Sequence, residues 1–338
     1  MAERHFVVIG NGPAGNRAAR TLRERSAGDR VTVISKARQS CYSPHLLPDF
    51  IAGKIGEEKV EVCPFSSYRD EAIKLRCSQE AVSVDIGQRQ VVLGHKEVLP
   101  YDGLIIAVGG QPFIPGRLAP FRDLLLTLKT IEDARLWIER LKEVDSVLLV
   151  GGDLTSVSVA KALVHLGKKV TFLLDSDAFW PLRADAKLLE TVSSALSAKG
   201  VEVLADSPVQ GIAALPGGGF EVQAGDWTLQ PGLIGAFFGL VPDIGFLARS
   251  GLKIDRGILV DEYLNTGFPE VFAAGDCAQI FHPELRDYWV SVGYENALAL
   301  GRAAASNLVS GDAQEAAEAE SIFEVQGVRL NTSWWADF

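Results

Sequence analysis

The sequence has few cysteines, no long apolar run and fewer basic than acidic residues. Cys41, Cys63, Cys77 and Cys277 form no C-x-x-C pair, which argues against a disulfide framework or a zinc site. No apolar run approaches the roughly 18 residues of a membrane span, and the N-terminus predicts a strand rather than a signal peptide. Acidic residues outnumber basic ones 43 to 33, for a net charge of −10, whereas nucleic acid and anionic membranes are bound by basic faces. We therefore expect a cytoplasmic protein with neither partner.

Glycine is the abundant residue. The chain has 33 glycines, about one residue in ten against a usual 7% or so. Residues 6–34 and 146–175 share one order of apolar strand, glycine turn, small-residue helix and second strand. This order predicts two βαβ units and parallel sheets, and a length of 338 residues corresponds to about two domains.

The first glycine turn has the pattern G-x-G-x-x-G, formed by Gly10, Gly12 and Gly15. Between a strand and a helix this pattern is typical of dinucleotide binding: the three glycines allow a tight turn, backbone approach to a pyrophosphate, and close helix packing. The helix N-terminus adds free N–H groups for the phosphates. An acidic residue is expected about 20 residues on to bind ribose hydroxyls, but Ser35 and Lys36 end the second strand. A serine can still hydrogen-bond a ribose, more weakly.

Five segments, taken together, resemble the FAD-dependent pyridine nucleotide-disulfide oxidoreductases. This family includes rubredoxin and ferredoxin reductases, NADH oxidases, the flavoprotein part of nitrite reductase and coenzyme A disulfide reductases. The matching segments are VVIGNGPAG (7–15), YSPHLLPDFIAGKI (42–55), YDGLIIAVGGQPFIP (101–115), KTIEDARLW (129–137) and VDEYLNTGFPEVFAAGDCA (260–278). They follow the family's order and spacing over most of the chain.

The resemblance implies an α/β fold with two Rossmann-like dinucleotide-binding domains, the second inserted in the first. We expect a discontinuous FAD-binding domain at residues 1–113 and 241–310. An NAD(P)H-binding-like domain is expected at residues 114–240. Residues 311–338 are expected to form a C-terminal interface segment that is truncated relative to the family.

The same resemblance implies FAD as the cofactor and no metal. By it, Asp276 would hydrogen-bond the ribitol of the flavin; the alternative is a helix N-cap at a glycine turn. Gly109 stands where the family has a glycine beside the bound FAD. The expected cofactor-binding residues are Gly10, Gly12, Pro13, Ala14, Gly15, Ser35, Lys36, His45, Ala107, Val108, Gly109, Gly275 and Asp276.

The second glycine turn departs from the family. Where the family has G-x-G-x-x-G-x-E, this chain has Gly151, Asp153, Ser156 and Ser158. A side chain at position 153 would block the approach of the backbone to a pyrophosphate, and a carboxylate would repel the phosphates. Leu174 or Asp175 ends the next strand, and neither position offers an arginine to hold a 2′-phosphate. We expect the fold of a nicotinamide domain without ordinary NAD(P)H binding.

His45 stands where disulfide-reducing members of the family carry their redox cysteine, so thiol chemistry lacks its nucleophile here. Cys41 lies four residues earlier and could replace it only in a helix, which Pro44 and Pro48 disfavour. His45 is the one candidate for a proton donor near the flavin. The alternative is a packed or partly exposed histidine that fills the space of the cysteine.

The C-terminal segment ends in Trp334, Trp335 and Phe338. Aromatic residues at the end of an acidic chain indicate a contact surface. We expect this segment to pack against the chain itself, a second copy or another subunit.

Four functions are compatible with these observations. An electron-transfer flavoprotein subunit that exchanges electrons with a protein partner is favoured by Asp153 and the aromatic C-terminus. An NAD(P)H-dependent flavin reductase is favoured by the resemblance alone. A flavin-binding module without turnover remains open, and a disulfide reductase is disfavoured by His45. No acid–base pair or nucleophile stands out, so the predicted site residues are cofactor contacts.

Overall fold

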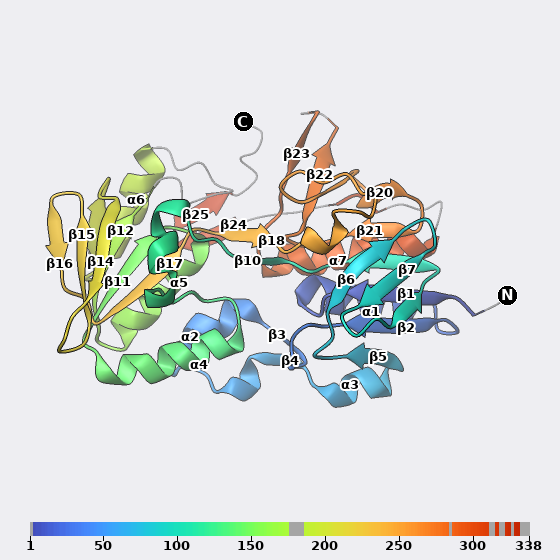
Figure 1. Cartoon of the computed structure of the whole chain (residues 1–338), viewed down its shortest axis with the longest axis horizontal. Coiled ribbons are helices and arrows are strands. Elements are labelled where there is room, and N and C mark those ends of the chain that lie inside the picture. Colours follow the sequence, from blue (N-terminus) through green and yellow to red (C-terminus); the bar gives the residue numbers. More distant parts are fainter. Residues whose placement is uncertain are drawn as a thin grey trace.

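A six-stranded sheet forms the centre of the first lobe (Figure 1). Its order is β20-β21-β9-β1-β2-β5, and the pairs are parallel except for β20 with β21. The strands are β1 (His5–Ile9), β2 (Arg30–Ile34), β5 (Ile73–Arg76), β9 (Gly103–Ile106), β20 (Asn265–Phe268) and β21 (Val271–Ala273). The inner strands are continuous apolar runs because both faces of a parallel sheet are covered. The structure is a computed structural model that describes residues 3–175, 186–283, 286–310, 315–317, 322–325 and 328–331.

Two helices, α1 (Pro13–Arg25) and α7 (Tyr294–Ser310), pack against each other beside this sheet. A Cβ added at Gly301 would lie 2.2 Å from the carbonyl oxygen of Ala14. Glycine therefore allows this close contact. The antiparallel meander of β6 (Ala81–Asp85), β7 (Gln90–Leu93) and β8 (Val98–Pro100) packs on the same core.

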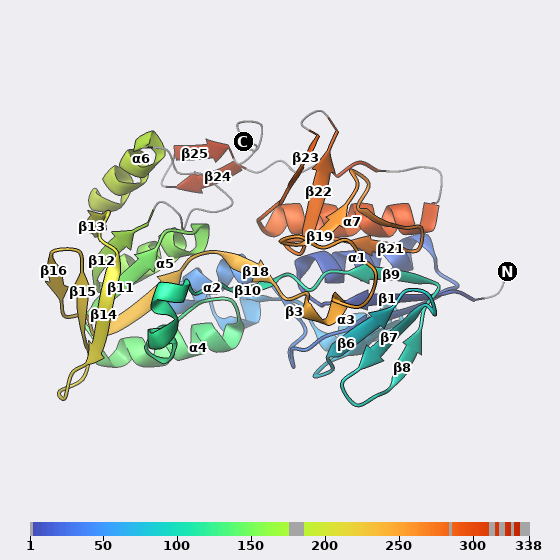
Figure 2. The same cartoon turned by 45° about the horizontal axis from the view of Figure 1, so that its top comes forward.

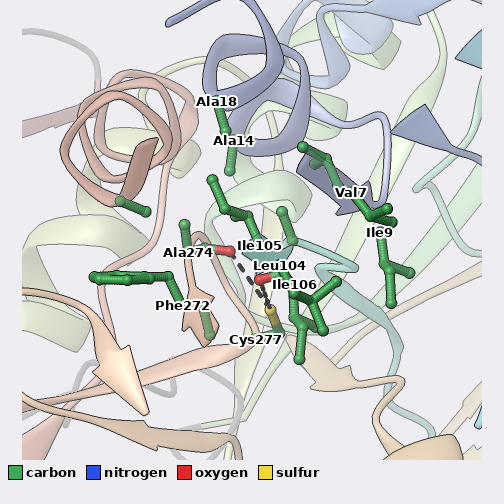
Figure 3. Close-up of a cluster of buried hydrophobic side chains, with 14 of the residues drawn as sticks. Val7, Ile9, Ala14, Ala18, Leu104, Ile105, Ile106, Phe272, Ala274 and Cys277 are labelled. Carbon is green, nitrogen blue, oxygen red and sulfur yellow. Dashed lines mark hydrogen bonds between the residues drawn. The ribbon is translucent and has the colours of Figure 1, made fainter. Parts of the chain in front are cut away.

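The core between β9, β21 and α1 is shown in Figure 3. Cys277 is fully buried there, and its Sγ lies 3.5 Å from the carbonyl oxygen of Ile106 and 3.4 Å from that of Ala274. Burial raises the pKa of the Cys277 thiol to about 11. This thiol is protonated at neutral pH and packs as a small apolar group.

The second lobe contains a four-stranded parallel sheet with the order β13-β12-β11-β17. Its strands are β11 (Ser146–Gly151), β12 (Lys169–Leu174), β13 (Glu202–Ala205) and β17 (Leu233–Phe237). The helices of this lobe are α4 (Ile131–Arg140), α5 (Leu154–His165) and α6 (Ala186–Ser197). An antiparallel sheet of β14 (Val209–Ala214), β15 (Phe220–Ala224) and β16 (Trp227–Leu229) completes it.

The two lobes are joined where β10 (Gly110–Pro112) pairs antiparallel with β18 (Leu240–Pro242). Figure 1 shows these strands running between the sheets. All strands of the second sheet lie between them in the chain, while β20 and β21 return to the first sheet. The predicted fold class, two Rossmann-like domains with the second inserted in the first, is confirmed.

Helix α2 (Leu47–Ile51) is supplied by the first part of the chain but packs with the second lobe, beside α4 and α5. Figures 1 and 2 both show α2 next to α4. Leu47, Ile51 and Val60 are buried in one cluster with Trp137 and Val159. The two lobes therefore share a hydrophobic core.

The remaining elements are short. They are β3 (Cys41–Tyr42), η1 (Pro44–Leu46), η2 (Glu57–Lys59), β4 (Glu61–Cys63), α3 (Phe65–Asp70), η3 (Gly116–Leu124), η4 (Leu141–Glu143), η6 (Gly245–Leu247), β19 (Ile258–Val260), β22 (Ala278–His282), β23 (Asp287–Trp289), β24 (Ile322–Val325) and β25 (Val328–Asn331). Trp334, Trp335 and Phe338 lie outside the described residues. Across the described part of the chain, no helix is both long and apolar enough to cross a membrane.

Candidate functional site

The first glycine turn lies between β1 and α1. Gly10 has a φ of +109°, and a Cβ there would lie 2.2 Å from the carbonyl oxygen of Ala107. A Cβ on Gly15 would lie 2.0 Å from the carbonyl oxygen of Gly10. In contrast, nothing lies within 4 Å of the Cβ position of Gly12. Two of the glycines therefore allow close packing inside the protein, and the middle one leaves open space at the start of the helix.

The N-terminus of α1 is free to bind an anion. Gly12 is its N-cap and has no side chain to accept a hydrogen bond from the first turn, Pro13 follows, and the first turn has no acidic residue. The first N–H groups of a helix need partners from outside it, and together with the helix dipole they favour a phosphate.

Asn11, between the first two glycines, has a polar atom without a partner. Its Oδ1 accepts a hydrogen bond from the Tyr68 hydroxyl at 2.8 Å, and Tyr68 accepts one from Asn16 Nδ2 at 2.7 Å. Asn11 Nδ2 is buried and has no hydrogen-bond partner among the described residues. Buried donors are nearly always satisfied, so this amide points to a ligand that completes the site.

A cleft of about 850 Å³ opens over this turn. Eleven of the thirteen expected cofactor-binding residues line it, and Gly15 and His45 do not. The eleven are Gly10, Gly12, Pro13, Ala14, Ser35, Lys36, Ala107, Val108, Gly109, Gly275 and Asp276. Sequence segments from the first and last thirds of the chain thus meet in one cavity.

Asp276 lies at one end of this cleft, after β21. The strand β22 follows it, so the alternative of a helix N-cap is wrong. Lys129 also lines the cleft, with its Nζ 3.8 Å from Asp276 Oδ2. Sequence reasoning missed Lys129, although the matching segment KTIEDARLW begins with it.

Ser35 and Lys36 also line the cleft, directly after β2. Ser35 is buried, and its N–H donates to the carbonyl oxygen of Arg76 at 2.9 Å. Lys36 Nζ lies 2.8 Å from Glu80 Oε1 and 3.8 Å from Asp243 Oδ2. Both carboxylates line the cleft, so the basic residue at the end of β2 is paired with acidic ones.

His45 lies outside the lining of the cleft. It is exposed in the 3-10 turn η1, and its ring centroid is 4.3 Å from that of Tyr294. Partial desolvation lowers the pKa of His45 below its usual value, so the imidazole is neutral at pH 7. This position, exposed and in ring contact with Tyr294, matches a partly exposed histidine better than a proton donor to the flavin.

Cys41 does not replace the missing redox cysteine. It lies on β3 opposite Cys63, and burial raises its pKa to about 12, so the nucleophilic thiolate is absent at neutral pH. The prolines that argued against helix here instead occupy the first turns of η1 and α2, where the missing N–H is tolerated. Among the described residues, no group of side chains could hold a metal ion.

The second glycine turn, between β11 and α5, repeats the first in its backbone. Gly151 has a φ of +119°, and a Cβ there would lie 1.9 Å from the carbonyl oxygen of Phe237, as Gly10 faces Ala107. The N-cap of α5 is Asp153, at the place of Gly12. The two turns therefore differ mainly in the side chain at the helix N-terminus.

The Asp153 carboxylate accepts two backbone hydrogen bonds. Oδ1 accepts from Ser156 N at 2.9 Å, inside the first turn of α5, and Oδ2 accepts from Gly239 N at 3.0 Å. Burial raises the pKa of Asp153, while the N–H donors act in the opposite direction. The carboxylate thus binds the helix N-terminus that would otherwise bind a phosphate.

The bond to Gly239 also links the start of α5 to the segment that follows β17. Gly239 follows β17, which lies on the opposite side of β11 from β12. Ligands of doubly wound sheets bind at this change of direction, outside the carboxyl ends of the strands. At the end of β12, Asp175 is paired with Arg117, whose guanidinium carbon lies 5.4 Å from the centroid of the Phe238 ring. The expected absence of an arginine at this strand end is thus corrected, since Arg117 reaches Asp175 from η3.

Comparison with known proteins places this geometry in a family. The family model described as pyridine nucleotide-disulphide oxidoreductase matches residues 4–305. The chain is 24% identical over 312 residues to nitrite reductase [NAD(P)H] of Bacillus subtilis (strain 168), which covers 89% of this chain and 37% of that protein. It is 26% identical over 275 residues to nitric oxide reductase FlRd-NAD(+) reductase of Escherichia coli O157:H7, covering 81% and 72%.

Solved structures share the fold. The covalent putidaredoxin reductase–putidaredoxin complex superposes with a TM-score of 0.87 at 23% identity, covering 97% of this chain and 81% of that one. A NAD-dependent persulfide reductase from A. fulgidus gives a TM-score of 0.86 at 24% identity, covering 95% and 62%. The chain spans little more than a third of the B. subtilis nitrite reductase.

Proposed function

The chain belongs to the pyridine nucleotide-disulphide oxidoreductase family and is an FAD-dependent oxidoreductase, and we propose that it is an electron-transfer flavoprotein that exchanges electrons with a protein partner. In this proposal the inserted domain binds no NAD(P)H. The FAD domain is assigned to residues 1–113 and 241–310, the inserted domain to 114–240 and a contact segment to 311–338.

The cleft of the first lobe fits FAD. It offers an uncapped helix N-terminus, open space at Gly12 and the unpartnered amide of Asn11. When bound, FAD supplies the redox chemistry, and the protein supplies binding, orientation and electrostatics. We assign the pyrophosphate to the first glycine turn and the ribitol to Asp276.

The observation that carries the proposal is the pair of hydrogen bonds made by Asp153. A dinucleotide would have to break both, one to Ser156 and one to Gly239, and place its phosphates beside a carboxylate. Like charges 4 Å apart repel by about 1 kcal/mol in water and several times that near a protein surface. The names of two relatives include NAD(P)H and NAD(+); in this proposal the chain differs from them in its electron donor.

The names of two relatives support the proposal of a protein partner. One is named a FlRd-NAD(+) reductase, and another, of Bacillus subtilis (strain 168), an assimilatory nitrate reductase electron transfer subunit, 25% identical over 281 residues that cover 82% of this chain and 36% of that protein. We propose that the partner or a second copy contacts residues 311–338. A cytoplasmic location is part of the proposal, supported by four cysteines that are all free.

The test is an anaerobic titration of the holoprotein with NADH, then NADPH, following flavin absorbance with dithionite as the control reductant. We expect dithionite alone to bleach the flavin of the wild type. Asp153→Gly, which restores the second glycine of the pattern and removes both hydrogen bonds, is the matched variant, and nucleotide binding should appear there first.

The alternatives give different results. Rapid, stoichiometric bleaching of the wild type by either nucleotide would support an NAD(P)H-dependent flavin reductase instead. A flavin that dithionite reduces but no protein acceptor reoxidises would indicate a binding module without turnover.

A further inference from the structure

We infer that Glu80 supplies the ribose-binding carboxylate that the end of β2 lacks, so that the site selects a dinucleotide whose adenosine ribose carries free hydroxyls. The inference rests on the proposed FAD site. An acidic residue in this place of the fold normally binds the ribose, and here Ser35 and Lys36 occupy it.

Hydrogen bonds hold the backbone of Glu80 against the end of β2. β5 pairs with β2 in parallel, with Arg76 opposite Ile34. Beyond the strands, Gln79 N donates to the carbonyl oxygen of Ser35 at 2.9 Å, and Gly94 N donates to that of Glu80 at 2.9 Å. The chain after β5 thus runs beside the residues that follow β2, and Glu80, in the connection between β5 and β6, lines the cleft.

Lys36 orients the Glu80 carboxylate. Its Nζ lies 2.8 Å from Glu80 Oε1, and this hydrogen bond raises the pKa of Lys36 and keeps it protonated. A carboxylate offers about four lone-pair sites, so the ion pair leaves capacity to accept from two ribose hydroxyls. The side chains of Lys36 and Glu80 are 64% and 54% exposed, and exposed ion pairs contribute little to stability. Ligand binding explains this arrangement better than stability does.

The charges also select against a phosphorylated ribose. Lys36 faces two carboxylates, Glu80 and, at 3.8 Å, Asp243. A 2′-phosphate would be repelled by the Glu80 carboxylate, whereas a neutral ribose hydroxyl can donate to it; Asp243 contacts Lys36 and is assigned no contact with the ribose. Arg38 also lines the cleft, so the Glu80 carboxylate, rather than the summed charge of the cleft wall, favours a free ribose hydroxyl.

The experiment uses the full-length chain freed of flavin, with FAD affinity followed by the quenching of flavin fluorescence. ADP and 2′,3′-dideoxy-ADP compete with FAD as probes of the adenosine half. We expect Glu80→Ala to weaken FAD and ADP binding about tenfold, in line with a charge-assisted hydrogen bond, and to leave 2′,3′-dideoxy-ADP unchanged. Asp243→Ala, the matched removal of the other carboxylate beside Lys36, should leave all three affinities within twofold of the wild type.

A second variant distinguishes the loss of a ribose contact from misfolding of the Glu80→Ala protein. K36E/E80Q places a carboxylate at the position after β2 and should recover most of the lost ADP affinity. Equal losses for ADP and dideoxy-ADP in Glu80→Ala, or selective loss in Asp243→Ala instead, would overturn the inference. Failure of the wild type to bind FAD at all is a separate result and would overturn the proposed function itself.

Discussion

Gly12 and Asp153 occupy equivalent positions in two turns of nearly the same backbone, and the side chain decides what each turn can bind. At Gly12 the helix N-terminus is uncapped and open to the cleft. At Asp153 the side chain accepts a hydrogen bond from one of the N–H donors of the first turn, that of Ser156. A cap of this kind stabilises a helix by about 1 kcal/mol, so replacing a phosphate-binding glycine with aspartate adds stability where it removes a ligand.

Asp276 gives the residue-scale prediction for the flavin end. Replacing Asp276 with alanine removes the carboxylate at the cleft wall beside Lys129, and FAD affinity should fall about tenfold, or about 1.4 kcal/mol. The measurement is the ratio of FAD to protein after gel filtration at low protein concentration. Asp287→Ala, on the exposed strand β23, is the matched control. Stoichiometric FAD in the Asp276 variant would refute the ribitol contact.

Some residues of the site could be predicted because each of them stands within a short, continuous stretch of recognisable sequence. The glycine turn, Ser35 and Asp276 each belong to a motif from which the local structure around the residue can be predicted. Glu80 and Asn11 could not be identified this way. Glu80 reaches the cleft only because β5 pairs with β2, and the orphan amide of Asn11 depends on Tyr68 in α3.

At the scale of elements, α2 shows what a sequence pattern cannot reveal. The βαβ units could be predicted from the spacing of their apolar residues and from their glycine turns, because each unit is one continuous stretch of sequence. α2 is five residues long and begins with a leucine and a proline, so it has no helical period to detect. Its partners on α4 and α5 follow it by many residues in the chain. Only the tertiary structure shows that it joins the core of the other lobe.

Truncation of Leu47 should therefore affect both lobes. Leu47 is 1% exposed in the shared core, and Leu47→Ala should lower the free energy of unfolding by about 2–5 kcal/mol. Urea unfolding followed by flavin absorbance and by far-UV circular dichroism should shift together, in one transition. Leu136→Ala on α4, where the side chain is 38% exposed, serves as the matched control. Separate transitions for the two probes would show that the lobes are energetically independent.

At the scale of the whole molecule, the dominant quantity is charge. The net charge of −10 favours approach of a partner with a basic surface, since opposite fields steer association over distances comparable to the Debye length. This long-range effect acts before any specific contact forms. It therefore influences the rate of electron exchange more than the strength of the final complex.

Electron transfer from the dithionite-reduced protein to cytochrome c, a basic haem protein, should slow severalfold as ionic strength rises from about 0.01 to 0.15 M. Stopped-flow absorbance at low and high salt measures this rate. Ferricyanide, a small anion, is the control and should react faster as salt increases. A cytochrome c rate that is independent of salt would contradict steering by net charge.

Because the second sheet is inserted between strands of the first, the two sheets are completed in a fixed order during synthesis on the ribosome. The second sheet is encoded within residues 146–237, so its strands emerge together. The first sheet must wait for β21, and until then β9 presents an unpaired edge, which is a site for misassociation. The lobe whose strands are synthesised first is thus completed last. Flavin uptake, which needs Gly275 and Asp276 in the cleft wall, becomes a late step in biogenesis.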